Sequence, residues 1–231
     1  MIVSGLFLFS LITCSTLFAQ QNLIVHGNFD DNIRDFDTDY EYSYGLGGDG
    51  DTGKYYLGNN AHNNSSSMFT FYDHTTGSGQ QRYMIVNGHT QSNKLVWGMT
   101  INVQAHSYYD LSMWITNLSP GGGSSLTPWL KTKLRIKING ETLLDNWLIP
   151  NVSQSNGIWN QVPVQHWYSA NSTTATIQIY DLCTSENGND FGLDDISFTY
   201  LYSNIVEAND DEYTTCFETP VTINPMDNDI I

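Results

Sequence analysis

The chain has 231 residues, of which 40% are hydrophobic and 13% aromatic. This composition argues against a wholly disordered chain and is enough for one good-sized core or for one domain plus a piece of another. Its formal net charge is −16, with 24 Asp and Glu residues against eight Lys and Arg residues. Nucleic acids and anionic membrane surfaces are negatively charged, so this balance argues against both as partners. Such acidity is typical of a secreted protein that binds calcium or that simply stays soluble.

The chain begins with an uncharged apolar run, residues 2–19, that ends at the small residue Ala19. This pattern predicts a signal peptide over residues 1–20, although no basic segment precedes the run. The run is shorter than the roughly 20 apolar residues of a membrane-spanning helix and has no basic flank. We therefore expect a secreted or cell-surface protein whose mature domain does not insert into a membrane. Thr13 before Cys14 fits a lipoprotein-processing site poorly, which argues against a lipid anchor.

Short segments with alternating apolar and polar residues follow the predicted signal peptide, as expected for half-buried strands. In residues 107–118 the alternation places Tyr109 inward and both Tyr108 and Trp114 on the outer face. No segment after residue 20 shows sustained helical periodicity. Together these patterns predict an all-β fold, an antiparallel two-sheet β-sandwich of the jelly-roll type. The predicted strands cover residues 54–58, 82–86, 94–103, 107–118, 130–138, 162–167 and 173–182, and residues 59–67 are predicted to be a loop.

Four of the basic residues share one face of a single predicted strand that ends at the turn Asn139-Gly140: Lys131, Lys133, Arg135 and Lys137. Asn-Gly is typical of a tight hairpin turn. Two interpretations of the basic face are open. It could be a cationic strip for an acidic glycan, or it could protect an edge strand from pairing with another chain, which is the commoner use of Lys on a strand.

Two adjacent carboxylates, Asp194 and Asp195, lie in the last predicted strand of the sandwich. Leu193 and Ile196 are three residues apart, so they can both face the core only if a β-bulge resets the register between them. We expect one of the two Asp side chains to tie this strand to another part of the chain, through a metal ion or a hydrogen-bond network. The other is expected to face solvent.

The composition changes after Tyr202, where an acidic linker over residues 207–212 precedes a short strand-like segment. We therefore predict a domain over residues 21–203, followed by a linker and the first strand of another domain in residues 204–231. Cys183 and Cys216 could pair in an oxidising compartment or could both remain unpaired.

No pattern in the chain favours catalysis. The His residues show no zinc-binding spacing, and no nucleophile-elbow or phosphate-binding motif is present. Asp73-His74 resembles an acid–base pair, but it lies in a turn rich in Gly and Thr, where we expect Asp73 to accept hydrogen bonds from backbone amides. We predict that the protein is not an enzyme. A jelly-roll glycoside hydrolase or polysaccharide lyase remains an alternative, because its two carboxylates would have no diagnostic spacing in sequence.

Several segments together resemble a galactose-binding-like β-sandwich, the superfamily that includes many carbohydrate-binding modules and is common in Bacteroidetes-type secreted surface proteins. These segments are NLIVHGNFD, DHTTGSG followed by MIVNG, VWGMTINV, YYDLSMW, IKING and GNDFGLDDISF. The tail ANDDEYTTCFETPVTINPMDND resembles the opening of a cadherin-like or immunoglobulin-like repeat. The resemblance implies a non-catalytic, monomeric glycan-binding or adhesion module at the front of a longer protein. A purely structural spacer without a glycan site is the alternative.

The resemblance also implies a structural calcium ion where the first strand meets the last, a setting whose hard oxygen ligands suit Ca²⁺. Matched to this sequence, the ligands would be Asp30 and Asp195, with backbone oxygens near Asn28 and in the turn from Asp51 to Lys54.

A glycan site needs an exposed aromatic plane beside polar groups. Trp114 is the best candidate by its outward phase, unless a neighbouring loop covers it, which is the commoner fate of Trp on a strand. Supporting candidates are Tyr108 and, in predicted loops, Trp129, Trp147 and Trp159.

Overall fold

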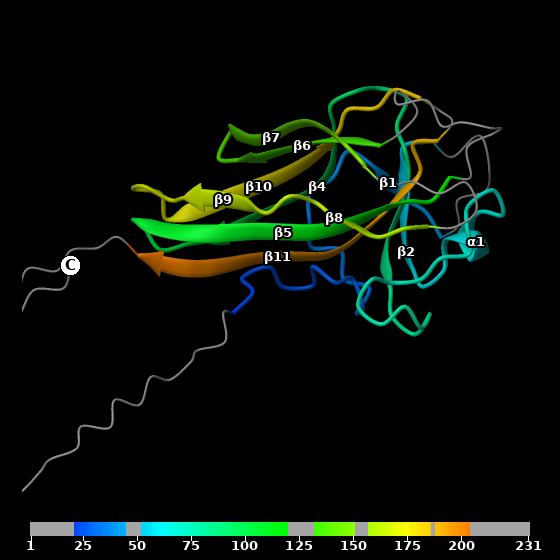
Figure 1. Cartoon of the computed structure of the whole chain (residues 1–231), viewed down its shortest axis with the longest axis horizontal. Coiled ribbons are helices and arrows are strands. Elements are labelled where there is room, and N and C mark those ends of the chain that lie inside the picture. Colours follow the sequence, from blue (N-terminus) through cyan, green and yellow to red (C-terminus); the bar gives the residue numbers. More distant parts are fainter. Residues whose placement is uncertain (1–20, 45–51, 120–131, 151–156, 186–187, 204–231) are drawn as a thin grey trace, which may run out of the picture.

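Two β-sheets packed face to face form the described part of the protein, which in this computed structural model comprises residues 21–44, 52–119, 132–150, 157–185 and 188–203 (Figure 1). This confirms the predicted all-β sandwich. The strands are β1 (Glu41–Tyr42), β2 (Lys54–Gly58), β3 (Tyr83–Asn87), β4 (Lys94–Asn102), β5 (Ser107–Asn117), β6 (Lys133–Ile138), β7 (Glu141–Leu148), β8 (Asn160–Gln161), β9 (Gln165–Tyr168), β10 (Thr174–Asp181) and β11 (Phe191–Ser203).

The larger sheet has seven strands, in the order β1-β2-β3-β11-β5-β8, with β9 also paired to β5. The smaller sheet has four strands, in the order β4-β10-β6-β7. Pairings within the sheets are antiparallel except that of β1 with β2, which is parallel. The long strands β5 and β11 therefore lie side by side at the centre of the larger sheet (Figure 1).

The core lies between the two sheets and is built from the inward residues of the alternating strands. Tyr109, Leu111 and Met113 of β5 are buried, as are Ile177 and Ile179 of β10. Burying one such side chain stabilises the fold by roughly 1.5–3 kcal/mol. The outer faces of the strands are left for other roles.

The interpretation of the basic strand β6 as a protected edge strand is wrong. This strand lies between β10 and β7, so it is an interior strand and has no edge to protect. Arg135 on its outer face donates hydrogen bonds to Asp145 at 2.7 Å and to Asn93 at 2.9 Å. The predicted hairpin turn is confirmed, because Asn139 and Gly140 have φ angles of 51° and 83° between β6 and β7.

A short helix, α1 (Ala61–Asn64), lies within the segment predicted to be a loop. The side chain of Asn60 accepts a hydrogen bond from the backbone N–H of His62 and caps the start of the helix. With four residues, α1 is too short to show in the sequence periodicity.

The predicted β-bulge in the last strand is confirmed. Asp194 of β11 pairs with Trp114 of β5, whereas Ser197 pairs with Ser112, so β11 holds one extra residue between these two pairs. The bulge brings Leu193 and Ile196 to the same inner face, where both are buried.

The first segment of the described chain is bound to β11. The N–H of Leu23 donates to the carbonyl of Phe198 at 2.8 Å, and the N–H of Ile196 donates to the carbonyl of Gly27 at 3.0 Å. A Cβ atom at Gly27 would lie 2.1 Å from the carbonyl oxygen of Ile196, so this close approach requires glycine. Backbone hydrogen bonds thus join the N-terminal segment of the described chain to the last strand, β11.

Several predictions concern residues outside the described part of the chain. They are the signal peptide in residues 1–20, the linker and further domain in residues 204–231, and the roles of Asp51, Trp129 and Cys216. Among the described residues, no helix has the length and apolar character needed to span a membrane.

Candidate functional site

The outer face of the larger sheet bears two groups of polar and aromatic side chains, one toward each end of β5. The first, which we call the carboxylate cluster, comprises Asp73, His74, Thr75, Asp194 and Asp195. The second, which we call the tyrosine stack, comprises Tyr108 of β5, Tyr168 of β9 and Tyr202 of β11.

Asp73 organises the turn that places the carboxylate cluster over the sheet. Its side chain is 1% exposed, and its Oδ2 atom accepts hydrogen bonds from the N–H groups of Thr76 at 2.6 Å and Gly77 at 3.2 Å. The hydroxyl of Thr76 donates to the same oxygen at 2.9 Å. This confirms the expectation that Asp73 binds turn amides and shows why the Thr and Gly residues follow it.

Asp194 is buried under this turn. Its Oδ2 atom accepts a hydrogen bond from the N–H of His74 at 2.8 Å, and its Oδ1 atom accepts one from the N–H of Asp195 at 2.8 Å. Burial raises the pKa of the Asp194 carboxyl to about 8. The nearby Asp195 and Asp73 carboxylates also raise this pKa, whereas the two backbone hydrogen bonds lower it.

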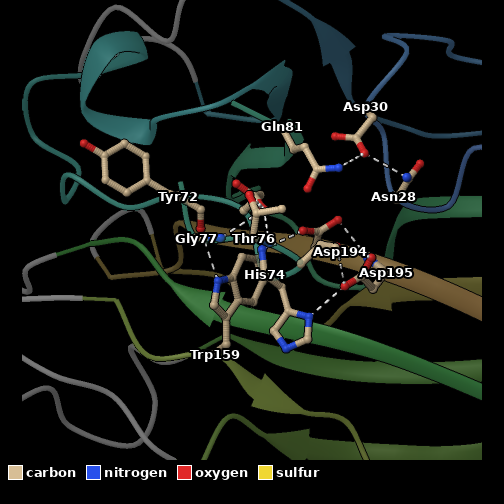
Figure 2. Close-up of polar contacts among 12 residues, drawn as sticks. Asn28, Asp30, Tyr72, His74, Thr76, Gly77, Gln81, Trp159, Asp194 and Asp195 are labelled. Carbon is tan, nitrogen blue, oxygen red and sulfur yellow. Dashed lines mark hydrogen bonds and ion pairs between the residues drawn. The ribbon is translucent and has the colours of Figure 1, made fainter. Parts of the chain in front are cut away.

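Asp195 occupies the bulge position, with a φ of 49° that turns its side chain back toward the same loop. Its Oδ2 atom lies 2.7 Å from Nδ1 of His74 (Figure 2). The hydroxyl of Thr75 donates to Oδ1 at 2.9 Å. We expected one Asp of the pair to face solvent, but Asp195 is 28% exposed and contacts the loop that Asp194 also contacts. Both carboxylates therefore fasten residues 73–77 to β11.

The ring of His74 covers Trp114. Trp114 lies on the outer face of β5, as its phase predicts, and it is half-buried. Its ring stacks against that of His74, with ring centroids 3.9 Å apart and an interplanar angle of 18°. The ring of Trp159 meets His74 edge-on at 5.7 Å. The ring face of Trp114 that a ligand would use is thus occupied by a side chain of the protein.

The other Trp residues predicted to bind a glycan contact other parts of the protein, where the structure describes them. Trp159 donates from Nε1 to the carbonyl of Tyr72 at 3.2 Å and packs edge-on against Tyr83 at 5.6 Å. Trp147 lies in β7 rather than in a loop, and it packs against the main core. Trp129 lies outside the described residues.

Asp30, one of the residues nominated for calcium, is surrounded by hydrogen-bond donors of the chain. Asp30 accepts hydrogen bonds from Asn28 at 2.8 Å, from Gln81 at 2.9 Å and from the N–H of Arg82 at 2.9 Å, and the Arg82 guanidinium also donates to the Asp30 carbonyl at 3.0 Å. Figure 2 shows Asn28 and Gln81 directed at Asp30, and His74 directed at Asp195.

Lys54 begins β2 and pairs with Asn87 of β3, and Asp51 lies outside the described residues. Within the described ranges, no group of three or more His, Cys, Asp or Glu side chains is arranged to hold a metal ion. Asn28 and Asp195 do line a common cavity of about 380 Å³, together with residues of the N-terminal segment and of β11. In the structure the carboxylates of Asp30 and Asp195 accept hydrogen bonds from donors of the chain.

The tyrosine stack differs from the carboxylate cluster because two of its three rings, those of Tyr168 and Tyr202, remain accessible. Tyr108 lies between the other two rings, 4.7 Å from Tyr168 and 4.8 Å from Tyr202, with interplanar angles of 31° in both pairs. Tyr168 is 39% exposed and Tyr202 is 54% exposed. All three are cross-strand neighbours on the outer face, since Tyr108 pairs with Tyr168 on one side and with Tyr202 on the other.

Polar groups border the tyrosine stack. Asp110 follows Tyr108 by two residues on the same face of β5, and its Oδ1 atom lies 2.5 Å from Nδ1 of His166 in β9. A cavity of about 380 Å³ next to the stack is lined by Tyr108, Glu141, Leu143, His166, Trp167 and Tyr168. None of these lining residues is Lys or Arg. The arrangement offers flat apolar surfaces beside hydrogen-bonding groups.

Sequence reasoning nominated Tyr108 but missed Tyr168 and Tyr202. The sequence signal that could have found them is their place in strands. Tyr168 directly follows the inward Trp167, and Tyr202 lies in the last strand of the domain. Nothing in the sequence shows that these strands flank Tyr108.

Comparison with known proteins gives fold similarity only. No family model matches the chain, and no curated protein matches it. A cyclase from Fischerella sp. TAU, solved in complex with (3Z)-3-(1-methyl-2-pyrrolidinylidene)-3H-indole, aligns with a TM-score of 0.51 and 10% identity over 80% of this chain and 100% of the cyclase.

Two further similar structures have lower scores. A putative sugar-binding protein from Bacteroides thetaiotaomicron aligns with a TM-score of 0.40 and 12% identity, covering 78% of this chain and 100% of that protein. The CBM22-1 xylan-binding domain from Paenibacillus barcinonensis Xyn10C aligns with a TM-score of 0.35 and 12% identity, covering 56% of this chain and 78% of that domain. At these identities the likeness concerns the β-sandwich fold.

Proposed function

We propose that this domain is a non-catalytic carbohydrate-binding module and that the tyrosine stack is its binding site. The observation that carries the proposal is the set of three adjoining tyrosine rings on the outer sheet face, two of them more than a third exposed, beside a cavity with carboxylate and imidazole groups. A sugar ring has an apolar C–H face, which packs against an aromatic side chain, and a rim of hydroxyls that need hydrogen-bond partners. The stack and its polar border supply both.

The proposal rests on this site rather than on the similar structures. Two of these are described as sugar-binding or xylan-binding, but their TM-scores of 0.40 and 0.35 are too low to add to the argument. The site also differs from the one centred on Trp114 that the sequence favours, because His74 stacks on that ring.

Two tyrosine substitutions test the site. Tyr202→Ala and Tyr168→Ala should each weaken binding to the polysaccharide identified on a glycan array by about tenfold or more, the usual effect of removing an aromatic anchor. Tyr44→Ala is the matched control, since Tyr44 is 86% exposed but lies two residues after β1, outside the tyrosine stack. Equal losses in all three variants, or no binding of any glycan by the unmodified domain, would reject the proposal in favour of a structural spacer.

The absence of catalysis is part of the proposal and has its own measurement. The purified domain should release no reducing ends or unsaturated products from the polysaccharide that it binds. Measurable cleavage would revive the hydrolase or lyase alternative, and the loss of that cleavage in Asp110→Asn or Glu141→Gln would place it beside the tyrosine stack.

A structural calcium ion remains a separate proposal, because it follows from the family resemblance and not from the arrangement of the described residues. A carboxylate has about four lone-pair sites, so Asp30 and Asp195 would bind the ion beside their present hydrogen-bond donors or in place of some of them. A melting temperature that falls with EDTA and recovers with CaCl₂ would support it. An unchanged melting temperature in a domain free of metal by elemental analysis would reject it.

Export to the cell surface and a place in front of further repeats are also proposals, carried by the sequence of residues 1–20 and 204–231 alone. Fractionation of cells that express the full-length gene, followed by N-terminal sequencing of the mature protein, tests the first. A new N-terminus near residue 21 is the expected result.

A further inference from the structure

The geometry points to His74 as the residue that limits the length of the glycan site, an inference that rests on the proposed function. By occupying the ring face of Trp114, His74 closes one end of a row of outward side chains that begins at the tyrosine stack.

The row lies along a single strand. Tyr108, Asp110, Ser112 and Trp114 alternate with buried residues on β5, so all four face outward and all four are half-buried. At about 3.4 Å per residue in an antiparallel strand, the row is roughly 20 Å long. It has an aromatic ring at each end and polar groups between them, which is a suitable surface for an extended chain of several sugar units.

His74 lies where a sugar would stack at the far end of this row. Its ring is nearly parallel to that of Trp114, with the centroids 3.9 Å apart and an angle of 18° between the planes. A flat side chain at van der Waals distance takes the same position as the apolar face of a sugar ring. Trp114 is therefore a binding platform already occupied by the protein.

Several contacts hold His74 in this position. Its Nδ1 atom lies 2.7 Å from the carboxylate of Asp195, and its backbone N–H donates to the buried Asp194 at 2.8 Å. The turn that presents it is fixed by Asp73. Because its side chain and backbone are held separately, His74 is positioned by the fold and does not lie on Trp114 by chance.

The consequence is a site with one open and one closed end. A bound glycan can extend from the tyrosine stack along Asp110 and Ser112, but it meets the imidazole of His74 before it reaches Trp114. Affinity should therefore rise with chain length only until the row is filled, and additional sugar units should add nothing.

The variant His74→Asn tests this limit with little change to the loop. Its side-chain amide can still donate a hydrogen bond to Asp195, but it has no ring to cover Trp114. The matched control is Thr75→Val, which removes the other hydrogen bond to Asp195 and leaves His74 on Trp114. Ladders of cello-, xylo- and manno-oligosaccharides, from the disaccharide to the octasaccharide, would be titrated by calorimetry.

We expect the affinity to stop rising at the same oligosaccharide length in the unmodified protein and in Thr75→Val. In His74→Asn the plateau should move to longer oligosaccharides, with about a tenfold gain for the longest, the gain expected from one added aromatic platform. Adding Trp114→Ala to His74→Asn should remove this gain and leave the affinity for short oligosaccharides unchanged.

Quenching by acrylamide provides a readout that needs no sugar. The Trp fluorescence of His74→Asn should be quenched more strongly than that of the unmodified protein, and the increase should disappear when Trp114 is also changed to Phe. More quenching with an unchanged plateau would overturn the length limit and leave the tyrosine stack as the site. Unchanged quenching would show that His74 does not cover Trp114 in solution and would overturn the inference directly. If Tyr202→Ala has no effect on any oligosaccharide, the proposed function fails first.

Discussion

The two ends of β5 show how one strand face can serve two purposes. Tyr108 and Trp114 both point outward from the same strand, six residues apart. At one end, Tyr108 stacks with tyrosines that are 39% and 54% exposed. At the other end, Trp114 is covered by His74, and the covering loop is fastened by two carboxylates of β11. Phase along a strand thus determines which side chains point outward, and a distant loop determines which of them can be reached.

The largest expected contrast is in stability, between Asp194 at the covered end and Asp110 at the open end. Asp194→Ala removes a buried carboxyl that accepts hydrogen bonds from two backbone N–H groups, those of His74 and Asp195. A buried donor left without a partner costs about 1–3 kcal/mol, so we expect a loss of about 3 kcal/mol in the free energy of unfolding. For a domain of this size the melting temperature should fall by about 10 °C.

Asp110→Ala is the matched control, since Asp110 is also an outward Asp on the larger sheet that contacts a His. Its loss should cost less than about 1 kcal/mol, because an exposed pair contributes little. Urea denaturation of both variants measures the difference. Equal losses would mean that the carboxylate cluster does not stabilise the covered end more than the open end.

The second contrast is in pH dependence. Burial raises the pKa of Asp194 to about 8 in the folded protein, well above the usual value near 3.8 that applies to the unfolded chain. The folded state therefore binds the proton of Asp194 more tightly than the unfolded chain does. The stability that this proton binding contributes is fully present below about pH 4 and is lost as the pH rises to about 8. We expect the unfolding free energy to fall by about 2 kcal/mol between pH 6 and pH 8 from this group.

Asp194→Asn, which cannot ionise, should remove this slope between pH 6 and pH 8. Asp181→Asn is the matched control at a different place in the core. Burial raises the pKa of Asp181 to about 6, so its contribution has the same sign but is lost between about pH 4 and pH 6. Unfolding free energies measured over this pH range separate the two. An unchanged slope above pH 6 in Asp194→Asn would contradict the role of Asp194.

Much of the fold could be predicted because it depends on residues close together in sequence. The alternation in residues 107–118 correctly placed Tyr109 inward and Trp114 outward, and Asn139-Gly140 marked its turn. The spacing of Leu193 and Ile196 indicated the bulge in β11. Each of these features is a local consequence of side-chain period or turn chemistry.

The features that were missed depend on contacts between distant segments. His74 and Trp114 are 40 positions apart in the numbering, and Tyr202 is 94 positions from Tyr108, yet both pairs stack. The Asn139-Gly140 turn indicated β7 on one side of the basic strand β6, but nothing in the sequence of β6 shows that β10 lies on the other side. Strand order and loop placement are set by the packing of the whole domain, so these contacts had no local signal.

The smallest expected effect is the change in stability when the tyrosine stack is altered. This change decides whether the end of β5 that bears Tyr108 is available for function. Pairs of aromatic rings contribute roughly 0.5–1.5 kcal/mol, and this is reduced where the rings remain in contact with water. Tyr202→Ala should therefore lower the unfolding free energy by less than about 1 kcal/mol, while it weakens glycan binding by about tenfold. A loss of stability as large as that of Asp194→Ala would make the stack a structural feature. A small loss of stability together with weakened glycan binding is the result expected of a ligand site, because three tyrosines on an exposed face add little to the stability of the fold.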